Sequence, residues 1–185
     1  MMLKKRDVHE VPALFELAIH PDVAPFNRYH ADTVDEFYFM TKQMIDGEKE
    51  GKLLSRTILD EYEQPIGTIN LFDIHDNTGF FATWIGAPYF GKGYNKQAKE
   101  EFLLEVFSTT LIEYIFMKVK KTNIRSKMAA LKLPYIIEAH TLVPHLDQTL
   151  NIPDDIYDVF IITKEHFISY RHFISAENPE TEIVS

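Results

Sequence analysis

The sequence predicts a mixed α+β fold in which a twisted, mostly antiparallel sheet is flanked by helices. Three strand-like segments follow one another in the middle of the chain, and the short turns between them indicate an antiparallel meander. Two helix-like segments precede this meander, and helices and strands alternate only after it. The predicted order is β-α-α-β-β-β-α-β-α-β-β, which differs from the strict βαβ alternation of a doubly wound sheet.

Two helices are predicted near the start of the chain. Val8–Ile19 places apolar side chains at the spacing of a helix with one buried face. The second helix begins at Thr33, because Thr33-Val-Asp-Glu36 matches a capping box, and it ends at Gly47 or Gly51. The loop between the two helices, Pro25–His30, is too aromatic to serve only as a connection.

The meander consists of three segments with alternating and β-branched residues. They are Lys52–Leu59, Pro65–Ile74 and Phe80–Gly86. Asp60-Glu-Tyr-Glu-Gln64 and Asp76-Asn-Thr-Gly79 have the composition of tight turns and separate the three strands.

Helices and strands alternate in the second half of the chain. Pro134 stops the last of the predicted helices because its ring cannot continue a helix. The predicted elements are a helix over Tyr94–Thr110, a strand over Glu113–Lys121, a helix over Asn123–Leu133, and strands over Tyr135–Leu142 and Ile156–Thr163.

The length and composition indicate one globular domain. The chain has 185 residues, and we expect residues 1–174 to form a single domain and residues 175–185 a flexible tail. Cysteine is absent, which excludes disulfides, cysteine zinc sites and a thiol nucleophile. The histidines lack a recognised metal-ligand spacing, so no metal is predicted.

The charge and hydropathy favour some partners over others. The net charge of −9 disfavours nucleic-acid binding and favours a cationic partner such as an amine. No apolar run is long enough to cross a bilayer, and the N-terminus does not have the pattern of a signal peptide, so we expect a cytoplasmic protein without membrane contacts.

Gly91-Lys-Gly-Tyr-Asn-Lys96 lies between a predicted strand and a predicted helix. A glycine turn lets successive backbone N–H groups converge, and the helix N-terminus adds positive potential, so the loop is suited to a pyrophosphate. A plain strand-to-helix turn needs glycine as well, and the pattern alone leaves both interpretations open.

Two other kinds of phosphate-binding loop are excluded. In the dinucleotide fingerprint a third glycine would fall on Lys96. In the P-loop pattern Gly86–Lys92 matches, but Gly93 follows where Ser or Thr must bind Mg²⁺. A P-loop also opens a parallel βαβ sheet, whereas this loop follows a meander, so a nucleotide hydrolase is not expected.

The loop resembles the pyrophosphate loop of the GNAT superfamily of N-acetyltransferases, (Gln/Arg)-x-x-Gly-x-(Gly/Ala). Aligned with Phe90–Asn95, its central glycine is Gly93, while Phe and Asn occupy the first and last positions. The branch typified by ribosomal-protein alanine acetyltransferases commonly has Trp-Gly-Lys-Gly-Tyr-Ala here, which Phe90–Tyr94 resembles more closely.

The resemblance continues downstream. The same branch has Asn-x-x-Ser and then Lys-Leu-Gly-Phe, and this chain has Asn123-Ile-Arg-Ser126 and then Lys132-Leu-Pro-Tyr135 at the same spacing. Tyr157–Phe167 is similar to the last strand of the family.

The resemblance implies a GNAT fold and an acetyl-CoA-dependent N-acetyltransferase. In such enzymes a splayed strand pairs with the pantetheine arm through its backbone, while the glycine loop holds the pyrophosphate. For the side chain of Trp84 we expect a place in the core, and Asn123 also caps its helix. The implied cofactor-binding residues are Trp84, Ile85, Gly86, Gly91, Lys92, Gly93, Tyr94, Asn95, Lys96, Asn123 and Ser126.

The resemblance also bears on catalysis. It implies that Ser126 donates a proton to the leaving thiolate, because the Tyr that many GNAT enzymes use aligns with Ala130. The Glu that the ribosomal-protein branch uses as a base aligns with Phe80, so the general base is unassigned. Three residues remain open for that role, namely Asp73, His75 and Glu138.

The acceptor and the assembly state stay open. We expect the acceptor near Pro25–His30 and the loop between the last two strands, and a small-molecule amine or a peptide N-terminus would both suit the chemistry. A homodimer is left open, as is a non-catalytic acyl-CoA-binding or sensor domain of the same fold. A basic cluster forms either a solvated face or a contact with the adenosine 3′-phosphate: Lys118, Lys120, Lys121, Arg125 and Lys127.

Overall fold

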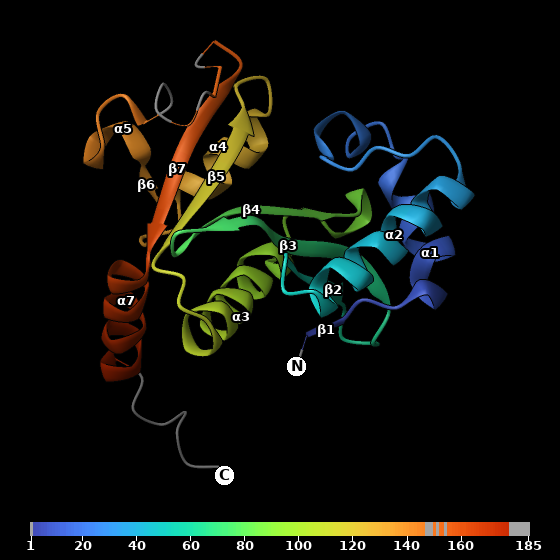
Figure 1. Ribbon diagram of the computed structural model, residues 1–185, viewed down its shortest axis with the longest axis horizontal. Coiled ribbons are helices and arrows are strands. Elements are labelled where there is room, and N and C mark those ends of the chain that lie inside the picture. Colours follow the sequence, from blue (N-terminus) through green and yellow to red (C-terminus); the bar gives the residue numbers. More distant parts are fainter. Residues whose placement is uncertain (1, 147–149, 151, 154, 178–185) are drawn as a thin grey trace.

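A mixed seven-stranded sheet forms the centre of the molecule. Figure 1 shows the computed structural model, which describes residues 2–146, 150, 152–153 and 155–177. The strand order is β1-β2-β3-β4-β5-β7-β6, and every neighbouring pair is antiparallel except β4–β5. The strands are β1 Leu3–Lys5, β2 Leu54–Leu59, β3 Pro65–His75, β4 Thr78–Ile85, β5 Tyr114–Lys120, β6 Ile137–Glu138 and β7 Tyr157–Thr163.

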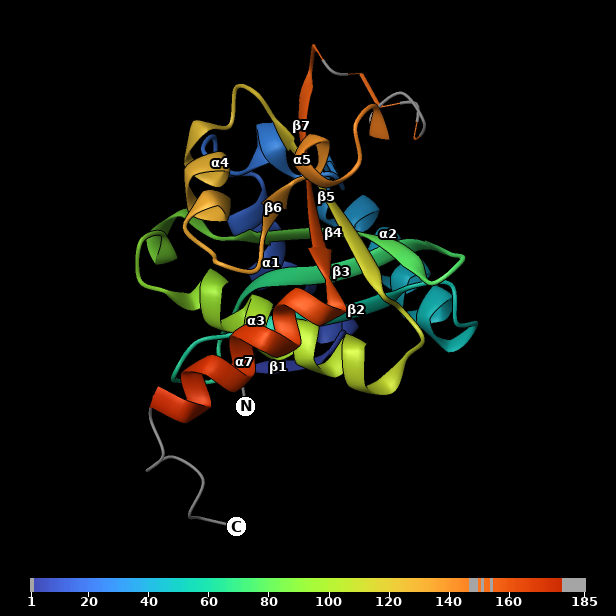
Figure 2. The same ribbon diagram turned by 90° about the vertical axis from the view of Figure 1, so that its left-hand side faces the viewer.

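Helices cover both faces of this sheet, as Figure 2 shows. Phe81 of β4 contacts Phe102 in the main core under α3, whereas Trp84 packs with α1 and α2 on the opposite face. This division follows from the alternation of side chains along a strand. The helices are α1 Val11–Ala18, α2 Val34–Lys49, α3 Tyr94–Thr109, α4 Ile124–Leu131, α5 Ala139–Leu142 and α7 Lys164–Glu177. Short 3₁₀ turns are η1 Val8–Glu10, η2 Ala24–Phe26 and η3 Ala87–Tyr89.

The predicted fold class and most predicted elements are confirmed. The hydroxyl of Thr33 accepts a hydrogen bond from the Glu36 N–H at 3.2 Å, as the capping box requires. The carboxylate of Glu36, however, accepts from the N–H of Asp32 at 2.8 Å rather than from that of Thr33. Helix α2 passes through Gly47 and ends before Gly51, whose φ of 72° breaks the helix.

Of the two strands predicted near the C-terminus, the first is wrong and the second is confirmed. The strand predicted over Tyr135–Leu142 is reduced to Ile137–Glu138, because the chain turns into α5 directly afterwards. The strand predicted over Ile156–Thr163 is confirmed as β7. The segment Tyr157–Phe167, which resembles the last strand of the family, continues beyond β7 into a helix, because the Thr163 hydroxyl accepts a hydrogen bond from the His166 N–H at 3.1 Å and caps that helix.

Helix α7, over Lys164–Glu177, was not predicted, and it extends into the tail that was expected over residues 175–185. It packs through Phe167, which is fully buried against Phe107 and Tyr135. Residues 175–177 of the predicted tail belong to this helix, and its remainder, 178–185, lies outside the described residues. Within the described ranges, none of the helices combines the length and the apolar character needed to cross a membrane.

The sheet divides into two antiparallel blocks. Strands β1 to β4 form one block and β5 to β7 the other, and four parallel residue pairs between β4 and β5 connect them. In Figure 1 the second block rises away from β4 on the side of α4, while β2 and β3 stay beside β4. The two strands at the centre of the sheet therefore diverge.

The first block is tied to α2 and α3 by a buried guanidinium. Arg56 of β2 is 6% exposed and donates to Glu48 of α2 at 2.8 Å and to Glu105 of α3.

We expect Arg56→Met to lower the free energy of unfolding by about 2–3 kcal/mol, because it leaves two partly buried carboxylates without a partner. Denaturant titration measures this loss. Lys49→Met, which breaks an exposed pair with Asp46, serves as the control and should cost less than about 0.5 kcal/mol. Equal losses in both variants would contradict the assignment.

Candidate functional site

The divergence of β4 and β5 leaves backbone groups free at the centre of the sheet. The last parallel pair is Phe81 with Met117, yet β4 continues to Ile85 and β5 to Lys120. Beyond this pair, each strand keeps its partner on the other side, β3 or β7. The facing edges of the two strands are therefore free to pair with an extended ligand.

The predicted residues at the end of β4 differ in what they can offer. The side chain of Trp84 lies in the cluster of α1 and α2, as expected, and that of Ile85 lies in the main core, so only their backbones remain for a ligand. The N–H of Gly86 donates to the carbonyl of Ile66 at 2.8 Å and is therefore committed to β3. A Cβ at Gly86 would meet the side chain of Leu17 at 2.7 Å, so this glycine permits close packing of α1.

The glycine loop after β4 has the backbone of an anion site. Gly91 and Gly93 have φ angles of 73° and 89°, and Gly93 is the N-cap of α3. A Cβ at either glycine would meet no atom within 4 Å, so the loop borders open space. The first intrahelical bond runs from Gln97 to Gly93, which leaves the N–H groups of residues 94–96 without a helical acceptor. Such a turn attracts phosphate oxygens.

Three side chains of the predicted loop point elsewhere. The Tyr94 hydroxyl donates to Glu61 in the β2–β3 turn, and this hydrogen bond raises the pKa of Tyr94 to about 12. The Lys92 ammonium lies 5.5 Å from the ring centre of Tyr89, and Lys96 lies 3.9 Å from Glu100. These residues can contribute backbone N–H groups to a ligand while their side chains hold the loop in place.

Asn95 and Lys99 of α3 each bury a polar group that has no partner among the described residues. The Oδ1 atom of Asn95 is buried and accepts no hydrogen bond from the described part of the chain. Lys99, one turn later, is 4% exposed, and no acid or acceptor lies on its ammonium among the described residues. Burial lowers the pKa of Lys99 to about 8. Sequence analysis missed Lys99, although its spacing from Phe102 and Leu103 places it on the apolar face.

The first turn of α4 lies beside the glycine loop. The Oδ1 atom of Asn123 accepts from the Ser126 N–H at 3.1 Å and caps α4, as predicted. The hydroxyl of Ser126 makes no hydrogen bond within the described ranges. The guanidinium of Arg125 lies 3.6 Å from the ring centre of Phe90 and donates to the carbonyl of Asp22 at 3.2 Å. The structure thus brings the two predicted motifs together.

The open candidates for a base lie in different surroundings. Phe80, which aligns with the glutamate base of the ribosomal-protein branch, packs against Phe116 at 5.7 Å between ring centres. His75 is exposed and pairs with Asp76 at the hairpin tip, and Glu138 pairs with His140. Asp73 pairs with Arg28 at 3.3 Å. Of the three candidates, it is the one that contacts the aromatic loop between α1 and α2.

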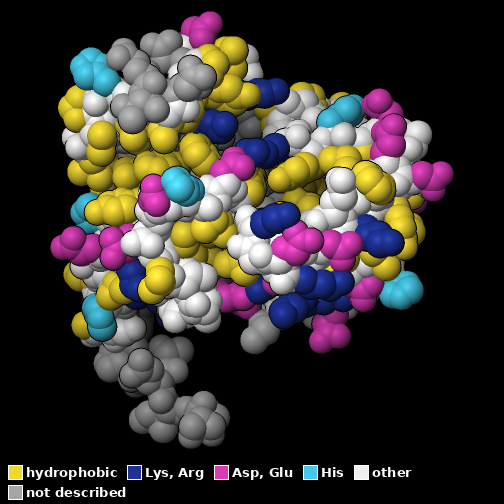
Figure 3. Space-filling model, in the orientation of Figure 1, with side chains coloured by type: hydrophobic (Ala, Val, Ile, Leu, Met, Phe, Trp, Pro, Cys, Tyr) yellow, Lys and Arg dark blue, Asp and Glu magenta, His cyan; other side chains and the backbone are white. Residues whose placement is uncertain are grey.

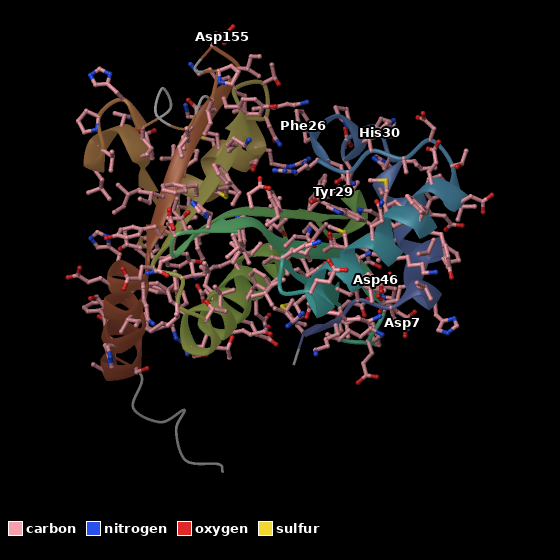
Figure 4. The ribbon with its side chains drawn as sticks, in the orientation of Figure 1. Asp7, Phe26, Tyr29, His30, Asp46 and Asp155 are labelled. Carbon is pink, nitrogen blue, oxygen red and sulfur yellow. The ribbon has the colours of Figure 1, made fainter. Side chains whose placement is uncertain are left out.

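This aromatic loop faces the divergent strands. Figure 4 shows Tyr29 above β4, on the side of the loop that faces β5 and β7, whereas Asp155 lies at the far end of the second block. The ring of Tyr29 meets Phe72 edge-on at 6.3 Å, and burial raises the pKa of its hydroxyl. The loop is therefore fixed over the strands by aromatic contacts.

The basic cluster does not form one surface. Lys120 donates to the carbonyl of Pro25 at 2.9 Å, and Lys127 pairs with Asp158 at 2.8 Å. Lys118 lies over the ring of Phe80 at 5.0 Å. Lys120 thus contacts the aromatic loop, Lys127 contacts β7, and Lys118 contacts a ring of β4.

Comparison with known proteins places this geometry in a family. The model of the acetyltransferase (GNAT) domain matches residues 1–135. A comparison with curated proteins finds no match. The matched region includes the meander, the glycine loop and Asn123 to Ser126, but not β7 and α7.

Solved structures with the same fold cover nearly the whole chain. An apo nucleotide-linked sugar GNAT is 18% identical, with a TM-score of 0.73 over 94% of this chain and 92% of that one. The spermidine N-acetyltransferase of Vibrio cholerae with CoA and spermine is 15% identical, with a TM-score of 0.69 over 90% and 96%. The ribosomal-protein-S5-alanine acetyltransferase of Vibrio fischeri is 15% identical, with a TM-score of 0.65 over 88% and 93%.

The buried Lys99 should cost stability. Because the folded state holds this lysine at a pKa of about 8 and the unfolded chain at 10.5, the unfolded chain binds more protons between these values. The penalty is therefore full below pH 8 and disappears as the pH rises to 10.5. We expect Lys99→Met to raise the unfolding free energy at pH 7 by roughly 2 kcal/mol.

Denaturant titrations from pH 7 to 10 measure this difference. The advantage of Lys99→Met over the unmodified protein should shrink across that range, whereas the exposed control Lys96→Met should change stability by less than about 0.5 kcal/mol at every pH. A Lys99→Met protein that is less stable at pH 7 would show that the ammonium has a stabilising partner.

Proposed function

The chain belongs to the GNAT acetyltransferase family, and we propose that it is an N-acetyltransferase that moves the acetyl group of acetyl-CoA to a primary amine. The observation that carries this proposal is the end of β4–β5 pairing at Phe81 and Met117, together with the glycine loop that follows β4 and opens α3. Free strand edges suit an amide-bearing arm, and a helix N-terminus suits its phosphates.

Acetyl-CoA would then bind along the gap. The N–H groups of residues 94–96 would receive the pyrophosphate, and the free edge of β4 from Ala82 to Ile85 would pair with the pantetheine amides. The buried polar groups of α3 fit this ligand. Side chains of a helix lean toward its N-terminus, so phosphates bound at the loop end of α3 would lie on the side toward which Lys99 leans and would offset the burial of its charge.

The reaction is a direct attack on the thioester. The neutral amine forms the new C–N bond at the acetyl carbon, and backbone N–H groups stabilise the oxygen of the tetrahedral intermediate. The C–S bond then breaks, and Ser126 donates its hydroxyl proton to the leaving thiolate and regains one that the acceptor nitrogen loses through solvent. Of the three candidate bases, Asp73 is the one that contacts the aromatic loop, through Arg28. Loss of the proton to solvent does not require a carboxylate base.

One observation favours a second function. The rings of Phe80 and Phe116 fill the place of a catalytic carboxylate, so a domain that binds acyl-CoA without transferring the acyl group would fit the same geometry. Such a sensor would bind acetyl-CoA and release no thiol with any amine.

Thiol release from acetyl-CoA across a panel of amines tests the enzyme against the sensor. We expect release with at least one amine, and we expect Ser126→Ala to lower kcat about 100-fold while the affinity for acetyl-CoA is unchanged. Calorimetry measures that affinity. Binding without release on every amine would favour the sensor, and an unchanged kcat in Ser126→Ala would remove Ser126 from the reaction.

The glycine loop can be tested with a matched pair of variants. Gly93 and Gly51 have φ angles of 89° and 72°, and a Cβ at either would meet no atom within 4 Å. An alanine at either site should therefore cost about 1 kcal/mol of stability through backbone strain. Calorimetry with CoA should show a loss of affinity of at least about tenfold for Gly93→Ala and no change for Gly51→Ala. Equal affinities would mean that the pyrophosphate binds elsewhere.

A further inference from the structure

We propose that the amine acceptor carries an anionic group, a phosphate or a carboxylate, which Lys118 and Arg28 bind at the acyl end of the site. This inference rests on the proposed acetyl transfer and names the class of its acceptor. It distinguishes a small anionic amine from a polyamine, whose additional ammonium groups would meet the same two cations.

The position of Lys118 in the gap between β4 and β5 places it at the acyl end of the site, where the acetyl group of the proposed ligand would lie. It follows Met117, the last β5 residue that pairs with β4, and thus stands where the strands begin to diverge. Its ammonium lies 5.0 Å from the ring centre of Phe80 and 5.8 Å from that of Tyr157, and no acid pairs with it in the described part of the chain. Phe80 occupies the position at which the family resemblance places a carboxylate base.

Arg28 lies over the neighbouring ring. Phe72 of β3 is directly opposite Phe80 of β4, and the guanidinium of Arg28 lies 3.6 Å from the ring centre of Phe72. Two cations from different parts of the chain therefore cover two adjacent rings of one aromatic floor. Such a floor suits the carbon skeleton of a small molecule, while the cations above it suit an anionic substituent.

The local charge is opposite to that of the whole protein. The chain carries a net charge of −9, yet the described residues place three cations at the site, Arg28, Lys118 and Lys120. Among these residues one acid pairs with a cation of the set, namely Asp73 with Arg28, and the side chain of Asp73 is 61% exposed. Figure 3 shows Lys and Arg side chains along the hollow between the block of β5 and β7 and the part formed by α1 and α2. A concave site of one sign of charge concentrates ligands of the other.

The phosphates of CoA do not account for these cations. The glycine loop lies beyond Gly86, six residues along β4 from Phe80, which corresponds to about 20 Å of extended strand. Arg125 and the helix N-terminus stand at that distant end, on Phe90. Lys118 and Arg28 are thus too far from the pyrophosphate loop to serve it, and the acceptor is the remaining partner.

The same cations explain how the site works with phenylalanine in place of a carboxylate. Nearby positive charge disfavours an ammonium and favours the neutral amine that attacks the thioester. An acceptor held through its anionic group would bring its amine into this field already close to the acetyl carbon. Binding and activation would then come from one set of side chains.

Calorimetry on the CoA-bound protein tests the inference with acceptors that differ in one group. Glucosamine 6-phosphate should bind at least about tenfold more tightly than glucosamine, because a charge-assisted contact contributes about that factor. Lys118→Met and Arg28→Met should each reduce the ratio severalfold, whereas Lys42→Met on the exposed side of α2 should leave it unchanged. Thiol release should follow the same order.

Two further arms separate the sources of the negative charge. β-Alanine against β-alaninamide measures the preference for a carboxylate, and spermidine measures the response to a polycation. The inference is overturned if glucosamine or spermidine binds as tightly as glucosamine 6-phosphate, or if Lys118→Met leaves every ratio unchanged. A protein that does not bind CoA at all would instead overturn the proposed acetyl transfer.

Discussion

The divergence of β4 from β5 is the constraint on which the site depends. Each of these strands has a full antiparallel partner, β3 or β7, while the parallel contact between them is limited to four pairs. Because antiparallel ladders hold both strands along their length, the sheet can open at its centre without losing the order of either block. The glycine loop, the cap of α4 and the aromatic loop all adjoin this opening.

The charge at the site is opposite in sign to the net charge of the chain. The chain is acidic as a whole, but the charged groups over the aromatic floor are mainly cations, and Lys99 of α3 is buried with no partner among the described residues. Burying an ammonium costs stability that a packed apolar side chain would not cost. A ligand with phosphate groups would offset this cost, so the folded protein would be more stable with its ligand bound than without it.

Local signals in the sequence account for most of the elements. Thr33 and Asn123 cap helices through their own side chains, and Asp76 and Asn77 adopt the positive φ of a tight hairpin turn. These effects act within a few residues, so they can be read without the fold. The end of the chain was misjudged because the helix after Thr163 depends on the burial of Phe167 against residues remote in sequence.

The sequence by itself determined the order of the elements as far as α4, the glycine loop and the family resemblance, since each depends on neighbouring residues. Only the tertiary structure decided which cation stands over which ring, because the loop between α1 and α2 brings Arg28 to Phe72 and strand β5 brings Lys118 to Phe80. The hairpin turn fixes the pairing of the two rings locally, whereas the approach of a cation from a segment remote in sequence depends on the packing of the whole core. The family can therefore be predicted from the sequence, whereas the positive charge of the acceptor site follows from contacts between residues that are distant in sequence.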